Sequence, residues 1–263
     1  PGEMGGDCLN YGCVPSKTLL SAAAQTPKPS YADAMANVER AIATIAPNDS
    51  VERFEGQGVQ VICQAGRFAD ARTVETADGT RIRARRFVIA TGASAFIPPV
   101  PGLAETPYLT NETLWQLREK PGHLLIMGGG PIGCEMALAH ARLGSQVTLI
   151  ERASILPKDD PELVDLLRQR LVAEGIVLRE GVSVEAASGT SGAITLTLSE
   201  GETLTGSHLL VAAGRKANID GLNLEAASIQ TERGAVRVDA TTLSTNRKVY
   251  AIGDVAGGPQ FTH

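Results

Sequence analysis

Two cysteines near the start of the chain are the residues best suited to redox chemistry. Cys8 and Cys13 lie in the segment GGDCLNYGCVPSK, residues 5–17, with four residues between them. In a regular α-helix this spacing separates the Cα atoms by roughly 8.6 Å, whereas a disulfide tolerates only about 7 Å. A bridge therefore needs a distorted first turn, which the neighbouring glycines permit. The spacing favours a reducible bridge over a permanent staple, and a nearby helix N-terminus favours the thiolate form.

Three other interpretations of this pair stay open: two buried small residues, half of a zinc site, or a stabilising clip. Zinc is disfavoured because the other cysteines, Cys63 and Cys134, lie in segments that we interpret as strand and helix, without ligand spacing. Burial as free thiols leaves the glycines and Lys17 unexplained.

A second group of residues predicts a dinucleotide site. Gly128, Gly130 and Gly133 form a G-x-G-x-x-G motif between an expected strand and an expected helix. The first glycine permits the tight turn, the second lets the pyrophosphate approach the backbone, and the third lets helix and strand pack closely. The phosphates then face the N-terminus of the helix. We expect Ile132, inside the motif, to line the same site.

The acid at the end of the following strand bears on the choice of nucleotide. Glu151 ends QVTLIE, and we expect it to accept hydrogen bonds from the adenosine ribose hydroxyls. A 2′-phosphate would meet carboxylate repulsion there, so NAD(H) is favoured over NADP(H). The adjacent Arg152 is the counter-argument, since it could turn toward a phosphate. The alternative for the whole motif is a glycine turn that binds nothing.

The elements that must hold these residues alternate along the chain. The segments HLLIM, QVTLIE and IVLRE read as buried strands, separated by helices near residues 131–144 and 161–175. This alternation predicts an α/β fold with a parallel sheet and helical crossovers, followed by a small β-meander. Helices are also expected at about 14–25 and 31–46. Residues 58–90 are expected to be β-rich, with a hairpin turn at Asp78-Gly79, and the four prolines of residues 97–107 indicate a linker.

Composition excludes several classes of function. The chain has 263 residues and a net charge of -5, and no cluster of its lysines and arginines forms a stripe, which argues against nucleic-acid and membrane-surface binding. No apolar run approaches the length of a membrane span. Four cysteines are too few for a disulfide scaffold, so we expect a cytoplasmic protein.

With these motifs in place, the chain resembles the FAD-dependent pyridine nucleotide–disulfide oxidoreductases. GGDCLNYGCVPSK is similar to the redox-active disulfide signature of that family, and VYAIGDVAGGPQFTH to its second flavin motif. ATGASAFIPPVPG and LVAAGRKANIDGLNLE resemble the segments that enter and leave its NAD domain. The resemblance implies two Rossmann-like dinucleotide-binding domains. These are an incomplete FAD domain, residues 1–106 and 232–263, and an NAD(P)-binding domain, residues 107–231.

The resemblance also implies roles for single residues. Cys8 is the thiol that attacks the substrate, and Cys13 lies against the flavin. Lys17 lies near the flavin N5 and pairs with Glu135; the alternative for that pair is a salt bridge that joins domains. Gly214 lies near the nicotinamide. The residues implied to line the FAD are Gly66, Thr91, Gly92, Ser94, Gly253 and Asp254.

The implied activity is that of an oxidoreductase that passes electrons from NAD(P)H through FAD to a small disulfide or mercuric substrate. The intact protein is expected to be a homodimer. The family's N-terminal FAD fingerprint and C-terminal dimerisation domain are not found in this sequence, so we expect a fragment without turnover. An isolated nucleotide-binding module or an interaction domain is the alternative. His123, His140 and His208 are interpreted as surface or turn residues, whereas His263 matches a family histidine beside the flavin.

Overall fold

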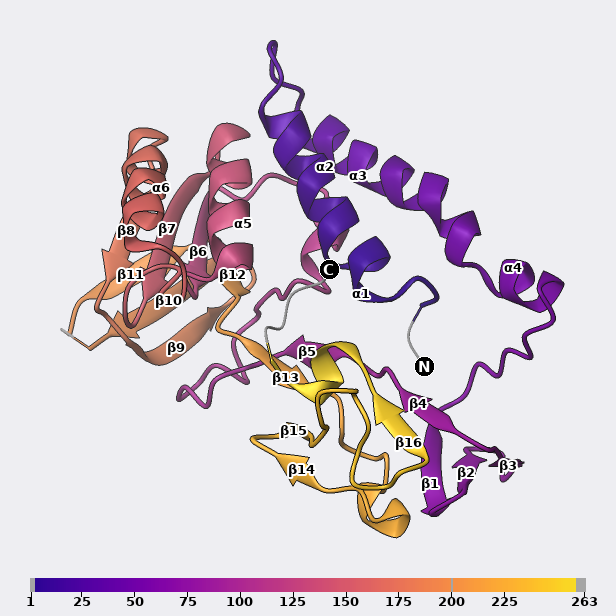
Figure 1. Ribbon diagram of the computed structural model, residues 1–263. Helices are drawn as coiled ribbons and strands as arrows, with labels where there is room; N and C mark the ends of the chain where they lie inside the picture. The colour runs from indigo at the N-terminus through magenta and orange to yellow at the C-terminus, as the bar shows by residue number, and fades with distance from the viewer. Residues whose placement is uncertain (1–2, 200, 259–263) are drawn as a thin grey trace. The chain divides into compact units, whose positions relative to one another are not determined.

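The computed structural model describes residues 3–199 and 201–258, which form two compact units (Figure 1). The first unit comprises Pro1–Met4, Asp49–Ser94 and Arg215–His263, and the second comprises Gly5–Asn48 and Ala95–Gly214. The second unit thus includes residues 5–48, which the resemblance places in the FAD domain. The cofactor-domain boundaries stay a prediction.

The second unit is built on a four-stranded sheet in the order β12-β6-β7-β8, with every neighbouring pair parallel. Helix α5 connects β6 to β7, and α6 connects β7 to β8. The predicted α/β fold with a parallel sheet and helical crossovers is confirmed. The bounds are β6 (His123–Met127), α5 (Pro131–Arg142), β7 (Gln146–Glu151), α6 (Pro161–Ala173), β8 (Val177–Glu180) and β12 (His208–Val211).

An antiparallel meander, β9 (Val184–Thr190), β10 (Ala193–Leu198) and β11 (Thr203–Gly206), follows β8. Its apolar side chains pack with those from one face of the parallel sheet in a common core. This buried layer fixes the strands whose ends carry the predicted nucleotide site.

Helices α1 (Gly6–Asn10), α2 (Cys13–Ala23) and α3 (Tyr31–Ile45) belong to the same unit. Apolar side chains of α2 and α3 share a core with those of α5 and of the sheet. Figure 1 shows α2 and α3 side by side. The helix that begins at Cys13 is therefore anchored to the unit that contains the glycine-rich motif.

The helices expected near residues 131–144 and 161–175 begin and end at residues whose types favour helix ends. Asp160 caps α6 by accepting a hydrogen bond from the Glu162 N–H at 2.9 Å, and Pro161 is the first helical residue. Gly144 and Gly175 follow α5 and α6 with φ of 91° and 84°, a left-handed conformation that glycine adopts without strain.

The first unit contains the predicted hairpin at Asp78-Gly79, between antiparallel β2 (Thr73–Thr76) and β3 (Arg81–Arg83). Gly79 has φ of 85°, and the Asp78 carboxylate accepts hydrogen bonds from the Thr76 hydroxyl and the Thr80 N–H. Residues 58–65, all of them described, form no strand, and Cys63 is exposed, so its placement in a strand was wrong.

The remaining elements of the first unit are short. Strand β4 (Phe87–Ile89) pairs in parallel with β16 (Val249–Ala251). The others are α4 (Val51–Gly56), β1 (Gly66–Asp70), β2 (Thr73–Thr76), β3 (Arg81–Arg83), β5 (Ala93–Ala95), β13 (Arg215–Ala217), β14 (Thr231–Glu232), β15 (Ala235–Val236) and the 3-10 helices η3 (Leu224–Ala227) and η4 (Gly253–Ala256). Two further 3-10 helices of the described residues are η1 (Ala46–Asp49) and η2 (Leu114–Gln116).

Candidate cofactor sites and thiol pair

The glycine-rich turn between β6 and α5 has a physical reason for each glycine. A Cβ on Gly128, whose φ is 116°, would lie 2.3 Å from the carbonyl oxygen of Ala212. A Cβ on Gly133 would lie 1.9 Å from the carbonyl oxygen of Gly128. At Gly130, by contrast, a Cβ would meet nothing within 4 Å. The turn is therefore closely packed on two sides and open where a pyrophosphate would approach the N-terminus of α5.

Glu151 lies at the end of β7 and is bonded to the backbone around it. Its Oε2 accepts from the N–H of Gly129 at 2.8 Å, and its Oε1 accepts from the N–H of Ala153 at 3.0 Å. The carboxylate is thus held against the glycine-rich turn with lone pairs left over for further donors. Ile132, in the first turn of α5, is half-buried against the apolar core.

The two cysteines flank a break between helices. Cys8 lies in α1, and Cys13 is the first residue of α2, capped by Gly12. The entrance to α1 is left-handed at Gly5 and Gly6, with φ of 93° and 61°. Both thiols are half-buried. The chain between them is therefore not a continuous helix, as a bridge between residues at this spacing requires.

Lys17 lies one turn after Cys13, so the two residues share a face of α2. Its Nζ donates to Oε1 of Glu135 on α5 at 2.5 Å, which confirms the predicted pairing. The lysine side chain is 55% exposed and that of the glutamate 30%, so the pair contributes little to stability. It fixes a positive charge at the start of the cysteine helix.

In the first unit, the segments that follow β4 and β16 lie together because the strands are parallel neighbours. Thr91 and Gly92 follow β4, and Gly253 and Asp254 follow β16. A Cβ on Gly92 or Gly253, with φ of 66° and 70°, would meet nothing within 4 Å. These glycines leave space beside the backbone, which fits the presence of a cofactor there.

Two residues that the sequence prediction did not single out organise this edge. The Arg215 guanidinium pairs with Asp254 at 3.2 Å and donates to the carbonyl of Ala93 at 2.5 Å. Asn218 accepts from the hydroxyl of Thr91 through its backbone carbonyl at 2.7 Å and from the hydroxyl of Ser94 through its side chain at 3.0 Å. Both residues lie in the segment RKANIDG. Polar residues that follow a strand were the signal in the sequence from which their role could have been predicted.

Gly66 and Gly214 have structural surroundings of their own. Gly66 pairs with Thr76 across the β1–β2 ladder, and a Cβ there would lie 3.0 Å from the Val74 side chain. Gly214 has φ of 131°, and its carbonyl accepts from the N–H of Phe96 at 2.9 Å. Their roles beside a flavin and a nicotinamide stay predictions.

The histidines differ from the prediction. His140 is fully buried on α5, so its interpretation as a surface or turn residue was wrong. Its Nδ1 lies 2.9 Å from the carbonyl of Met136 and its Nε2 lies 3.2 Å from the hydroxyl of Tyr31. Burial lowers the pKa of His140 to about 4. His123 and His208 lie half-buried on β6 and β12, where burial lowers the pKa of each ring; His263 lies outside the described residues.

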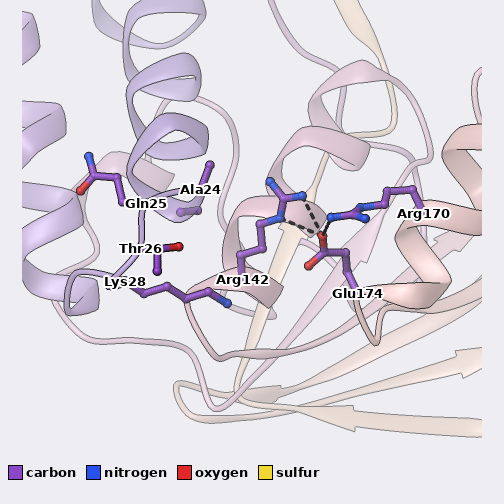
Figure 2. A pocket seen from close by; sticks show the side chains of 8 residues that line it. Ala24, Gln25, Thr26, Lys28, Arg142, Arg170 and Glu174 are labelled. Carbon is purple, nitrogen blue, oxygen red and sulfur yellow. Dashed lines mark hydrogen bonds and ion pairs between the residues drawn. The ribbon is translucent and has the colours of Figure 1, made fainter.

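A pocket of about 340 Å³ lies at the other end of α5, away from the glycine-rich turn (Figure 2). Figure 2 shows the guanidinium groups of Arg142 and Arg170 converging on one oxygen of Glu174, each at 2.7 Å. The hydrogen bond from Arg142 holds the pKa of Glu174 below its usual value. Cations at helix C-termini offset the negative end of the helix dipole, so we assign this cluster a structural role.

Two features are absent from the described residues. Within residues 3–199 and 201–258 no helix is long and apolar enough to cross a membrane. In that same part of the chain no three histidine, cysteine, aspartate or glutamate side chains are grouped to hold a metal ion.

Comparison with known proteins gives consistent matches along the chain. The family described as Pyridine nucleotide-disulphide oxidoreductase matches residues 2–263. A mercuric reductase of Lysinibacillus sphaericus is 34% identical, with 100% of this chain and 52% of that protein covered. The probable pyridine nucleotide-disulfide oxidoreductase RclA of Escherichia coli is 34% identical, with 98% of this chain and 59% of that protein covered.

Solved structures agree. The HOCl-induced flavoprotein disulfide reductase RclA from Escherichia coli matches with a TM-score of 0.90 at 33% identity, covering 98% of this chain and 59% of that one. LpdA from Mycobacterium tuberculosis matches with a TM-score of 0.85 at 28% identity, covering 97% of this chain and 60% of that one. The chain spans about half the length of the curated relatives that it matches.

Proposed function

Because the chain belongs to the family of FAD-dependent pyridine nucleotide–disulphide oxidoreductases, we propose that it carries the redox machinery of a flavin-dependent disulfide reductase. Reducing equivalents pass from NAD(P)H through FAD to a Cys8–Cys13 disulfide and then to a small disulfide or mercuric substrate. One observation carries the proposal. Helix α5 begins at the glycine-rich turn and bears Glu135, which is paired with Lys17 one turn after Cys13.

The nucleotide would be held by the turn at the start of α5. Gly128 and Gly133 keep the turn close to its neighbours, Gly130 leaves room for the pyrophosphate, and Ile132 lines the first helical turn. Gly214 is proposed to lie near the nicotinamide. This site and its strands would form the NAD(P)-binding domain, residues 107–231.

The flavin would be held in a second domain, residues 1–106 and 232–263. The residues proposed for it are Lys17, Gly66, Thr91, Gly92, Ser94, Gly253 and Asp254. FAD, when bound there, would supply the two-electron chemistry that links the reduced nicotinamide to a disulfide. The open space at Gly92 and Gly253 and the ion pair that fixes Asp254 support this assignment.

The thiols complete a balanced reaction. Two electrons and one proton from NAD(P)H, with one proton from solvent, convert the Cys8–Cys13 disulfide to two thiols. The Cys8 thiolate attacks a substrate disulfide, and one substrate thiol leaves. Cys13 then resolves the mixed disulfide, which releases the second thiol and restores the bridge. Lys17, fixed by Glu135, supplies positive charge near this chemistry.

NAD(H) is the proposed nucleotide in preference to NADP(H). The Glu151 carboxylate is fixed by two backbone N–H groups at the end of β7, where a ribose would lie. Its negative charge would repel a 2′-phosphate. The proposed substrate classes follow the names of the relatives, which include mercuric and disulfide reductases. The intact protein is proposed to be a homodimer.

A second candidate is a nucleotide-binding module without turnover of its own. The observation in its favour is that the four-stranded sheet, the glycine-rich turn and Glu151 all lie within one compact unit.

Absorption and activity of the purified protein would separate the candidates. In the intact protein we expect a bound flavin spectrum and NADH-dependent reduction of lipoamide, glutathione disulfide or mercuric ion, with Cys8→Ser inactive. The 263-residue chain alone is proposed to show no such turnover. Cys63→Ser is the matched control, because that cysteine is exposed and lies in the first unit, outside the proposed thiol pair. Nucleotide binding without flavin or turnover supports the module, and full activity of Cys8→Ser contradicts the thiol assignment.

A further inference from the structure

The loop that follows Glu151 is fastened to its surroundings at closely spaced backbone positions. Ala153 donates its N–H to Glu151 and accepts at its carbonyl from the N–H of Gly181 at 2.9 Å. Ile155, fully buried, donates its N–H to Oε1 of Glu180 at 2.8 Å. These hydrogen bonds of Ala153 and Ile155 hold the loop beside the proposed ribose position.

This loop and the glycine-rich turn hold each other. Leu156 donates its N–H to the carbonyl of Gly129 at 3.0 Å. The N–H of the same glycine donates to Glu151 at 2.8 Å. Gly129 is therefore bonded on both sides, once by the end of β7 and once by the loop. A movement of the loop would reach the turn that receives the phosphates.

An ion pair outside the nucleotide site holds the loop in this position. Arg168 on α6 binds Glu180 at the end of β8 through two bonds, Nε to Oε2 at 2.7 Å and Nη2 to Oε1 at 3.0 Å. The oxygen that receives Nη2 also accepts from Ile155. The Glu180 side chain is 23% exposed, and the hydrogen bond from Arg168 holds the pKa of its carboxyl below the usual value.

The loop needs such support because its backbone is strained. Leu156 has φ of 45°, a left-handed conformation that is unfavourable for a leucine. It persists only where the surrounding structure over-determines it. The buried Ile155 side chain and its bond to Glu180 immediately precede this residue.

We propose that Arg168 and Glu180 are positioning residues for pyridine nucleotide binding. The pair fixes residues 153–156, and through Leu156 and Glu151 it fixes Gly129 and the carboxylate beside the ribose. This inference rests on the proposed nucleotide site. Loosening the pair frees Ala153 from Glu151, so the carboxylate is less well aimed. NADH binding then weakens more than NADPH binding, because the contact that favours a free ribose is lost.

The variants Arg168→Met and Glu180→Gln test the proposal. Methionine retains the aliphatic stem but neither bond, and glutamine retains an acceptor for Ile155 without the charge. Glu202→Gln is the matched control. Glu202 pairs with Arg179, which lies beside Glu180 in β8, but Glu202 itself lies between strands β10 and β11 of the meander and not in residues 153–156.

Titration with NADH, NADPH and ADP gives the first readout. We expect each test variant to bind NADH about tenfold more weakly, with a smaller loss for NADPH, while Glu202→Gln binds as the wild type. If the test variants only lower the melting temperature and keep wild-type dissociation constants, the pair is merely structural and the proposal is overturned.

Amide hydrogen exchange of the ligand-free protein gives a readout without nucleotide. We expect faster exchange at Gly129, Ile155 and Leu156 in the test variants than in Glu202→Gln. Unchanged exchange there contradicts the proposal. A wild-type protein that binds no nucleotide refutes the proposed function. The exchange measurement needs no nucleotide, so it tests the positioning pair separately from the proposed function.

Discussion

The buried histidine of α5 should make the stability of the second unit depend strongly on pH. His140 is fully buried, and burial lowers its pKa from 6.5 to about 4, although the hydrogen bond with the Met136 carbonyl acts in the opposite direction; His208 adds a smaller lowering effect. Its Nε2 faces the hydroxyl of Tyr31, whose pKa burial raises. Lowering the pH is the perturbation, and His140→Gln is the comparison, since glutamine can accept from Tyr31 but does not titrate.

The sign and size follow from the two pKa values. Above pH 6.5 neither state binds a proton at this residue, so its contribution is fully present. Between pH 6.5 and about 4 the histidine is protonated in the unfolded state and not in the folded state, so the free energy of unfolding decreases as the pH is lowered. At 1.36 kcal/mol for each unit of pKa difference, the loss is about 3 kcal/mol when the fall is complete. The steepest slope approaches about 1.4 kcal/mol per pH unit.

Urea unfolding followed by tryptophan fluorescence is a suitable assay. Trp115 is the single tryptophan, is buried, and belongs to the same core as Tyr31, so it reports on this unit. Other groups titrate in both proteins, and their effects cancel in the difference between wild type and His140→Gln. We expect that difference to shrink by about 3 kcal/mol from pH 7.5 to pH 4. Parallel curves would refute the reasoning, because they would mean that the ring titrates normally.

Three further predictions concern the proposed cofactor machinery. NADH should raise the melting temperature more than NADPH at matched concentrations, because Glu151 opposes a 2′-phosphate; equal shifts would show that the carboxylate does not decide. Gly130→Ala should keep the melting temperature within about 3 °C yet weaken NADH binding at least tenfold, because the added Cβ enters the open space proposed for the pyrophosphate. Gly133→Ala should instead destabilise the fold. Calorimetry measures the stability of both variants, and titration measures their binding. Lys17→Gln should change the melting temperature by less than about 2 °C, because the pair with Glu135 is partly exposed, but in the intact protein it should lower turnover of a disulfide substrate. Unchanged turnover would leave the pair a structural contact.

Local signals in the sequence predicted much of the second unit. The strand and helix alternation, the glycines that end α5 and α6, and the cap at Asp160 depend on residues close together in the chain. The glycine-rich turn was predictable from its spacing between a strand and a helix, which the local contact of Gly133 with Gly128 requires, whereas the close approach of Gly128 to Ala212 was not predictable in this way.

Features that depend on distant contacts were not predictable in this way. The burial of His140 arises because α2 and α3 pack onto α5, and its hydroxyl partner comes from Tyr31. Arg215 and Asn218 acquire their roles only where the chain returns to the segment after β4. Residues 58–65, all described, have alternating apolar residues but form no strand, because a strand needs a partner that alternation cannot supply.

Stepwise anaerobic reduction of the flavin-loaded intact protein with NADH tests the central claim most directly, namely that electrons reach Cys8 and Cys13 through FAD. Long-wavelength absorbance between a thiolate and the oxidised flavin is the signal. The wild type should develop this absorbance after two electrons, Cys13→Ser should lack it throughout, and Cys8→Ser should show it before any reductant is added. The same spectra in both variants and the wild type would contradict the account.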